Sequence, residues 1–245
     1  YIELLAMGST GNLLNGNLSG IFPSDIYLIT GDIGVENGDT LILLEGTQFL
    51  FDGEYDFTIR GVLKAQGTEQ DSIIFDKYGE DPWGQLRLNS GSDGTVFEYV
   101  RISGASESGM YLWYASPTLK NVVISDNTNA DGGGMYLYYS NAILTNVAIN
   151  NNTSSNYGGG MYLSWSDPIL TNTIIKENTS YQGSGMYLTW SDPALINVTV
   201  ASNTADDDSG VLFLKWSDPS LTNTIIWNNM AESPWNVPLE SLEIH

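Results

Sequence analysis

The chain has 245 residues, with 8 Lys and Arg against 29 Asp and Glu, and a formal net charge of −21. Phosphate groups are bound by clustered Lys and Arg, so this charge argues against nucleic acid or an anionic membrane as a partner. The chain has no Cys and a single His, which excludes disulfides, thiolate catalysis, His-based triads and His zinc sites. No run of 18 apolar residues is present, so we expect no membrane insertion.

Taken in chain order, residues 1–17 lie outside any repeat, and we expect them to form an N-terminal cap or linker. Residues 18–108 contain short apolar strands separated by turn residues, and Gly46-Thr47 recurs as Gly67-Thr68, 21 residues on. This spacing predicts irregular coils of a repeating fold. The expected strands are Thr40–Leu44, Phe49–Phe51, Phe57–Ile59, Val62–Leu63, Ile73–Phe75, Leu86–Leu88 and Val96–Ile102.

Residues 109–230 repeat with steps of 25, 26, 25 and 26 residues. The five units begin MYLWYASPTLKN, MYLYYSNAILTN, MYLSWSDPILTN, MYLTWSDPALIN and LFLKWSDPSLTN. Apolar residues alternate with other residues within each unit, as Met110 and Leu112 do with Tyr111 and Trp113, and this period of two is typical of strands. One such unit cannot bury its apolar face alone, whereas stacked units can.

The sequence therefore predicts an all-β, right-handed parallel β-helix of about eight or nine coils, with one coil per repeat. No linker divides the chain, so we expect a single domain over residues 1–245, with residues 231–245 as a C-terminal cap or tail. Two columns of Asn recur at turn positions and predict ladders of side-chain hydrogen bonds between coils. The columns are Asn121, Asn146, Asn172, Asn197 and Asn223, and Asn127, Asn152, Asn178, Asn203 and Asn229.

A resemblance to a known family rests on two parts of the chain. The run GNLSGIFPSDIYLITGDIGVENGDTLILLEGTQFLFDG, followed by GVLKAQGTEQDSIIFD, resembles the first coils of secreted bacterial right-handed β-helix proteins with the pectin-lyase-like fold. The repeated GGGMYL, SDPxLTN and NT segments are similar to their later coils, so the resemblance covers roughly residues 17–230. It implies an extracellular or bacterial cell-surface location. Because this family includes polysaccharide lyases, glycoside hydrolases and adhesins, the resemblance implies no single activity.

The first candidate site is a strip of aromatic residues that alternate with the apolar residues expected to point inward. Stacked coils would bring these rings together on the outer face of one sheet, where they could bind sugar rings. The same strip could instead stabilise the sheet by cross-strand stacking, or be covered by a partner or a second copy of the chain. The ligand-binding candidates are Tyr111, Trp113, Tyr136, Tyr138, Tyr162, Tyr187 and Phe213.

A second aromatic column directly precedes the Ser-Asp-Pro turns. Its period places it pointing inward or at a corner, so we expect core or corner packing rather than a binding site. Its members are Tyr114, Tyr139, Trp165, Trp190 and Trp216.

The Asp residues of the Trp-Ser-Asp-Pro segments form an acidic column of Asp167, Asp192 and Asp218. Ca²⁺ prefers carboxylate oxygens, and an ion between two coils would relieve the repulsion between stacked carboxylates. Alternatively, each Asp accepts hydrogen bonds from backbone NH groups of its own turn. Calcium is the only cofactor that the sequence suggests.

An enzyme of this fold is the alternative function. Lyases that act on uronates need a base and a positive charge or calcium, but the cations of the clear repeats, Lys120, Lys176 and Lys215, fall in three different columns. Arg60 with Lys64, or Arg87 with Arg101, could converge. Pectin hydrolases of the resembling family carry Gly-His-Gly and Arg-x-Lys motifs, and this chain has neither. Two carboxylates alone can hydrolyse glycosides, so the chain could still be an enzyme.

We therefore expect a non-catalytic extracellular scaffold that binds a polysaccharide or another cell-surface partner through the aromatic strip. A polysaccharide lyase or glycoside hydrolase is the first alternative. A self-assembling surface fibre is the second, because coils with a repeating surface can associate with copies of themselves.

Overall fold

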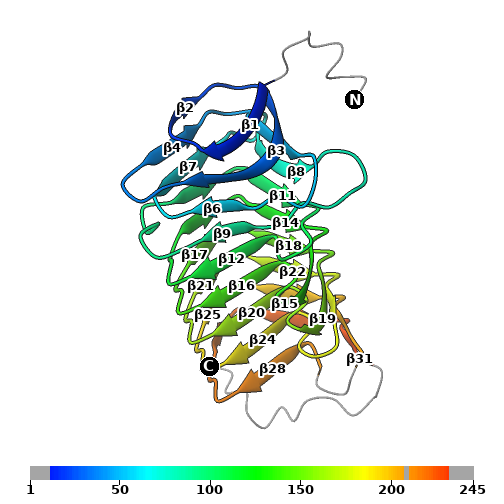
Figure 1. Cartoon of the computed structure of the whole chain (residues 1–245). Coiled ribbons are helices and arrows are strands. Elements are labelled where there is room, and N and C mark those ends of the chain that lie inside the picture. Colours follow the sequence, from blue (N-terminus) through cyan, green and yellow to red (C-terminus); the bar gives the residue numbers. More distant parts are fainter. Residues whose placement is uncertain (1–11, 207–209, 232–245) are drawn as a thin grey trace.

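The computed structural model describes residues 12–206 and 210–231 of the chain (Figure 1). Within these residues every strand pairing is parallel, and successive coils stack into one elongated solenoid whose axis runs from β1 to β31 (Figure 1). Among the described residues no helix could cross a membrane. The expected all-β parallel coil architecture is therefore confirmed.

Three long sheets form the walls of the solenoid. Sheet 1, seen at the front of Figure 1, contains β6 (Phe57–Ile59), β9 (Leu86–Leu88), β12 (Met110–Trp113), β16 (Met135–Tyr138), β20 (Met161–Ser164), β24 (Met186–Thr189) and β28 (Leu212–Lys215). Sheet 2 contains β2 (Gly20–Phe22), β4 (Thr40–Leu43), β7 (Val62–Gln66), β10 (Val96–Glu98), β13 (Thr118–Lys120), β17 (Ile143–Thr145), β21 (Ile169–Thr171), β25 (Ala194–Ile196) and β29 (Ser220–Thr222). Its nine strands, one per coil of the described residues, agree with the eight or nine coils expected.

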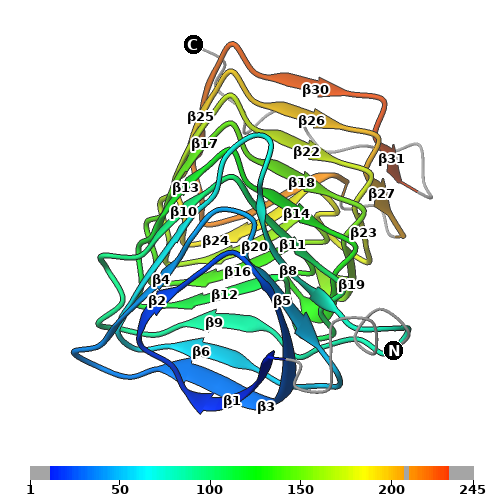
Figure 2. The same cartoon turned by 90° about the horizontal axis from the view of Figure 1, so that it is seen from above.

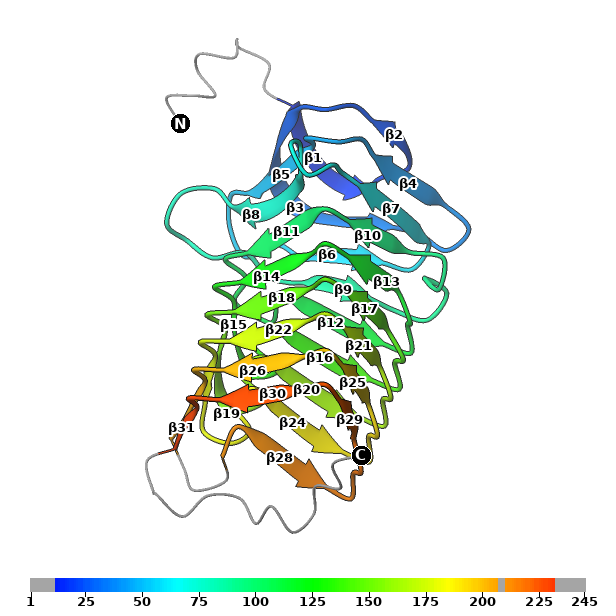
Figure 3. The same cartoon turned by 180° about the vertical axis from the view of Figure 1, so that it is seen from behind.

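Sheet 3 faces the viewer in Figure 3 and contains β5 (Gln48–Phe51), β8 (Ile73–Lys77), β11 (Val100–Ser103), β14 (Val123–Ser125), β18 (Ala148–Asn150), β22 (Ile174–Lys176), β26 (Thr199–Ala201) and β30 (Ile225–Trp227). The long strand β3 (Ile26–Val35) pairs with both β5 and β6, so it belongs to sheets 1 and 3 at once. A short corner sheet joins sheet 3 to sheet 1 in the later coils (Figure 2). It contains β15 (Thr128–Asp131), β19 (Thr153–Tyr157), β23 (Thr179–Ser180), β27 (Thr204–Ala205) and β31 (Met230–Ala231).

In the N-terminal coils, β4 to β9 lie at the expected strands with bounds that differ by up to three residues, whereas β2 and β3 were not among the strands expected. The expected strand Val96–Ile102 divides into β10 and β11, because Tyr99 between them has a φ of 50° and turns the chain. Strand β1 (Asn12–Asn17) pairs in parallel with β3, so the solenoid starts before the boundary expected at residue 17. Of the caps expected at residues 1–17 and 231–245, only residues 12–17 and 231 are described, and they belong to β1 and β31; the rest lies outside the described residues.

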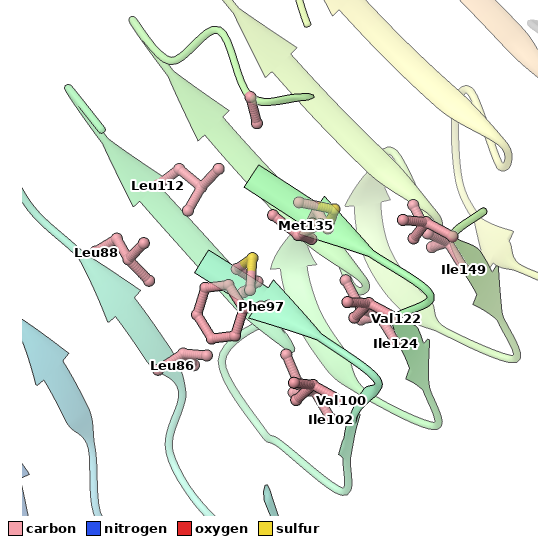
Figure 4. Close-up of a cluster of buried hydrophobic side chains, with 14 of the residues drawn as sticks. Leu86, Leu88, Phe97, Val100, Ile102, Leu112, Val122, Ile124, Met135 and Ile149 are labelled. Carbon is pink, nitrogen blue, oxygen red and sulfur yellow. The ribbon is translucent and has the colours of Figure 1, made fainter. Parts of the chain in front are cut away.

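The core is a set of inward columns, each with one residue per coil. In one coil Leu112 of sheet 1, Leu119 of sheet 2 and Ile124 of sheet 3 have no exposed surface, and their register partners in the next coils are buried as well. Figure 4 shows Leu112 beside Leu88, and Ile124 beside Ile149, in this core. The period-two pattern sends these side chains inward on every strand, and burying each contributes roughly 1.5–3 kcal/mol relative to leaving it in water. The core therefore holds each sheet in register along the whole solenoid.

The corners between sheets turn through single residues in the left-handed conformation. At the corner between sheets 2 and 3, the five Asn of the first column have φ values of 50–54°. Asn adopts this region more readily than most residues, and its side-chain amide bonds the same residue one coil away, as in Asn146 Nδ2 to Asn121 Oδ1 at 3.1 Å. This first ladder lies on the surface of the solenoid.

The second Asn column forms a buried ladder at the corner after sheet 3. Asn178 shows the pattern: its Oδ1 accepts from the backbone NH and the Nδ2 of Asn152 at 2.9 and 3.0 Å, while its own Nδ2 donates to Ile149 O and to Asn203 Oδ1. Asn127, Asn152, Asn178 and Asn203 have no exposed surface, so every one of these bonds is made away from water. Both Asn ladders expected from the sequence are confirmed.

We predict that Asn178→Ala lowers the free energy of unfolding by about 3 kcal/mol, because it leaves several buried donors and acceptors unpaired. Urea titration followed by circular dichroism measures this loss. The matched control is Asn172→Gly in the exposed ladder, which keeps a residue suited to the left-handed backbone and should cost less than about 1 kcal/mol. Equal losses in the two variants would contradict the importance of burial in the second ladder.

Candidate functional site

The outward face of sheet 1 gathers the aromatic residues singled out in the sequence. Strand pairing aligns Tyr111, Tyr136, Tyr162, Tyr187 and Phe213 in one column, and Trp113 and Tyr138 in the next. The alternating inward residues of these strands, such as Met110 and Leu112, have no exposed surface. The structure therefore brings all seven candidate ligand-binding residues together on one face.

The rings of the first column stack on one another along the solenoid axis. Ring centroids are 4.8 Å apart for Tyr111 and Tyr136, 5.3 Å for Tyr162 and Tyr187, and 4.7 Å for Tyr187 and Phe213, with interplanar angles of 7–10° for these pairs. Because the ring faces contact each other, a ligand that lies along the column meets ring edges and hydroxyl groups rather than faces. The stacking that the sequence analysis offered as the purely stabilising alternative is thus present, at roughly 0.5–1.5 kcal/mol per pair.

Part of this column is covered by the corner sheet. Tyr157 of β19 packs against Tyr187 at 4.7 Å and Tyr162 at 6.5 Å, and Tyr187 is only 6% exposed. Asp131 of β15 lies near the same tyrosines. Its Oδ1 is buried and has no hydrogen-bond partner among the residues that the structure describes, and burial raises the pKa of its carboxyl group. The first column is therefore a half-buried surface rather than an open platform.

The second aromatic column lies at the corner between sheets 1 and 2 and is exposed. The exposed fractions are 46% for Tyr114, 40% for Tyr139, 46% for Trp165, 45% for Trp190 and 63% for Trp216. The expectation of a corner position is confirmed, but an inward orientation is wrong for all five. The strand alternation ends at this corner, because each of these residues has a φ of 48–52° and turns its ring outward.

Bulky residues are rarely found in the left-handed conformation, which costs about 1–2 kcal/mol per residue. The equivalent corner between sheets 2 and 3 uses Asn, which tolerates this backbone better. Stacking of the corner rings offsets part of the cost: Trp165 and Trp190 lie 5.1 Å apart at 7°, and Trp190 and Trp216 lie 4.8 Å apart at 25°. The chain thus keeps large rings on the surface at a corner where smaller residues fit the backbone better.

The Ser-Asp-Pro turns beside these rings are explained by backbone hydrogen bonds. Asp167 Oδ1 accepts from the backbone NH of Asp192 at 2.6 Å, and Asp192 Oδ1 accepts from that of Asp218 at 2.6 Å. The buried Ser residues bond in the opposite direction along the axis, as in Ser166 Oγ accepting from Ser140 N at 2.9 Å. The carboxylates of Asp167 and Asp192 thus accept hydrogen bonds from the next coil, whereas the sequence had suggested donors in the turn of each Asp itself. The Ser ladder was missed, although its one-per-coil spacing was visible in the sequence.

Asp167, Asp192 and Asp218 are exposed and lie on successive coils. The carboxylates of Asp167 and Asp192 each point one oxygen at a backbone NH rather than toward a common centre. In residues 12–206 and 210–231 no three His, Asp or Glu side chains are grouped to hold a metal ion. This donor set does not fit a calcium site built from three carboxylates. Calcium therefore remains a prediction from the sequence alone.

A polar cluster that the sequence analysis missed lies at the N-terminal end of the aromatic face. Gln85 donates from its backbone NH to Asp56 Oδ1 at 3.2 Å and from its side chain to Glu107 Oε2 at 2.8 Å. Burial, and then the Glu107 carboxylate, raises the pKa of Asp56, and the Arg87 guanidinium lies 4.9 Å from the centroid of the Tyr111 ring. Residues of three different coils build this cluster, so no local motif in the sequence could reveal it.

The cation pairs proposed from the sequence do not form a basic groove. Arg87 lies on sheet 1 and Arg101 on sheet 3, while Arg60 pairs with Glu36 at 3.1 Å. Lys120 pairs with Glu98 at 2.7 Å. The described Lys and Arg residues thus lie on several faces of the solenoid. Most of them form an ion pair with a carboxylate or contact an aromatic ring.

The geometry defines the class of protein as a parallel β-solenoid with aromatic, Asn and Ser ladders. A family model described as a right handed beta helix region matches residues 85–230, more than half of the chain, and the chain belongs to this family. The handedness expected from the sequence is thereby confirmed. No curated protein and no solved structure matches the chain.

We predict that the protein loses stability as pH rises above about 10. Burial raises the pKa of Tyr136 above the ordinary value of 10.0 and raises the pKa of Tyr162 to about 12. Between pH 10, where tyrosines of the unfolded chain ionise, and about pH 12, where Tyr162 of the folded chain ionises, the unfolded chain has released protons that the folded chain retains. The free energy of unfolding therefore falls as pH rises through this window. Thermal unfolding at several alkaline pH values, with tyrosinate absorbance followed in parallel, measures the effect. Tyr136→Phe with Tyr162→Phe should reduce this sensitivity, and an unchanged pH profile in that variant would contradict the assignment.

Proposed function

We propose that this protein is a non-catalytic, extracellular β-helix scaffold that binds a polysaccharide of a cell surface through the aromatic face and corner of sheet 1. The observation that carries the proposal is the exposed aromatic corner, Tyr114, Tyr139, Trp165, Trp190 and Trp216, which retains large rings despite a strained backbone. Strained residues persist where the surrounding structure holds them in place, and they cluster at functional sites. Aromatic rings beside hydroxyl, amide and carboxylate groups are the usual means by which proteins bind sugars.

The composition supports a location outside the cell. Charged residues make up only 15% of the chain, and the outer faces of the repeats carry many Asn, Ser, Thr and Tyr residues. Such a surface presents hydrogen-bonding groups without strong attraction to nucleic acid or anionic membranes, since the net charge is −21. The resemblance to secreted bacterial β-helix proteins points the same way.

We predict that Trp165→Asn combined with Trp190→Asn weakens polysaccharide binding at least tenfold. Asn occupies the same left-handed conformation at the neighbouring corner, so the variant removes the rings while keeping the backbone, and stability should change by less than about 2 kcal/mol. Affinity electrophoresis through gels cast with neutral or acidic polysaccharides measures binding. Staining of the same gels for polymer loss tests the lyase or hydrolase alternative, for which the cluster of Asp56, Glu107 and Arg87 is the candidate centre.

The matched control is Trp227→Asn on sheet 3, which removes a ring that is 73% exposed on another face. This control should bind as the unchanged protein does. Undiminished binding in the double variant would contradict the proposed function. Running the gels with Ca²⁺ and with a chelator tests whether Asp167, Asp192 and Asp218 contribute through calcium, as the sequence suggested.

Self-assembly is the second candidate function, and exposed isoleucines on sheet 2 favour it. Ile143 and Ile169 are register neighbours with exposed fractions of 47% and 45%, and Ile196 in the adjacent coil is 36% exposed. Clustered apolar side chains on a flat sheet are typical of surfaces that contact another protein.

We predict that, if this surface joins two copies, the sedimentation coefficient rises with protein concentration and Ile143→Thr with Ile169→Thr abolishes the rise. Thr keeps the preference for strands while removing apolar surface, so the fold should be retained. Sedimentation velocity over a wide concentration range measures association. A constant coefficient for the unchanged protein would reject self-assembly through sheet 2.

A further inference from the structure

One column on the aromatic face changes abruptly in side-chain size. Strand pairing aligns Trp113, Tyr138, Ser164, Thr189 and Lys215 on successive coils of sheet 1. Trp113 and Tyr138 stack with ring centroids 4.4 Å apart at 20°. The next position holds Ser164, so the stack ends at Tyr138. The rings of Tyr114 and Tyr139 contact Tyr138 almost perpendicularly, at 83° and 84°, and within the described residues only Trp113 stacks on it.

Ser164 forms the floor of the place where the next ring would lie. Its side chain points outward, because Leu163 beside it points inward with no exposed surface, yet Ser164 is only 8% exposed. Tyr162 and Tyr187 lie in the column on one side of this position, and Trp165 and Trp190 lie at the corner on the other. Thr189 lies on the next coil directly below Ser164 and adds a second hydroxyl.

We infer that this place binds one pyranose ring of a neutral polysaccharide, stacked on Tyr138 as the next rung of the interrupted ladder. A sugar ring has a flat apolar face that suits stacking on Tyr138, where Trp113 is the only stacked ring among the described residues, and peripheral hydroxyls that suit Ser164 and Thr189. This inference rests on the proposed function and specifies where the polysaccharide is held.

The surrounding charges select a neutral sugar over a uronate. The exposed carboxylates of Asp167 and Asp192 stand on the corner beside the site, on the coils of Ser164 and Thr189. Lys215 lies one coil below Thr189, but its Nζ is 4.8 Å from the centroid of the Trp216 ring, which directs it toward the corner. A sugar carboxylate at this place would meet two negative charges, and Lys215, the cation of this column in the described coils, is directed to Trp216 instead.

Replacing the floor residue by an aromatic residue tests the site. Ser164→Tyr continues the stack of Trp113 and Tyr138, so the variant should fold and keep or raise its melting temperature while filling the site. We expect its affinity for hydroxyethyl cellulose, galactomannan or xyloglucan, whichever the unchanged protein binds, to fall at least tenfold. The matched control is Thr145→Tyr, which adds the same ring to an outward position of sheet 2 and should leave affinity unchanged.

The outcomes separate this inference from the proposed function. Loss of binding in both Ser164→Tyr and the double variant Trp165→Asn with Trp190→Asn supports both. Loss only in the double variant overturns the pyranose site at Ser164 and leaves the proposed function in place. Binding of polygalacturonate in preference to every neutral polymer also overturns the site while keeping the function. If the unchanged protein binds none of these polymers, the proposed function and the inference fall together.

Discussion

The stacking of coils in register is the constraint on which the rest of the structure depends. Parallel pairing repeats every ~4.8 Å along the solenoid, so each side chain has its counterpart in the next coil as its nearest neighbour on the same face. A column is stable only if its residues tolerate their own kind at that distance. Asn178 satisfies this by bonding Asn152 and Asn203, and Trp190 by stacking on Trp165 and Trp216. Carboxylates cannot bond one another when ionised, so Asp192 bonds the backbone NH of Asp218 instead.

The same stacking in register decides which side chains stabilise the solenoid and which remain available to contact a ligand. Stacked rings turn their faces to each other, so a ligand that meets a continuous aromatic ladder, whether Tyr111 to Tyr162 or the exposed corner rings Trp165 to Trp216, contacts ring edges rather than ring faces. A break in a ladder releases one ring face and opens room beside it. The change from Tyr138 to Ser164 is such a break, and it occurs where hydroxyl groups line the floor. In a repeating protein, a departure from the repeat is therefore a position where a binding site can form.

The negative charge of the solenoid disfavours anionic ligands. The chain carries a net charge of −21, and in the described parts of the chain ion pairs such as Lys120 with Glu98 are few and lie near the surface. Exposed pairs of this kind contribute little to stability, so packing and ladders carry the fold. The acidic corner of Asp167, Asp192 and Asp218 disfavours anionic ligands along the same face that presents the aromatic rings.

The sequence by itself determined the parallel β-helix, the coil length and the Asn ladders. Identical residues at a constant spacing must lie one above another once coils stack, and the period of two assigned Met110 and Leu112 to the core. Only the tertiary structure decided the orientation of residues at corners, because one left-handed residue such as Trp165 ends the alternation on which the sequence reasoning relied. Contacts between dissimilar residues of different coils were likewise beyond the sequence. Such contacts form because the chain returns to the same place once per coil, as in Asp56 with Gln85 and Glu107, Tyr157 with Tyr187, and the rings beside Ser164. No sequence spacing distinguishes these pairs from any other pairs of residues in neighbouring coils.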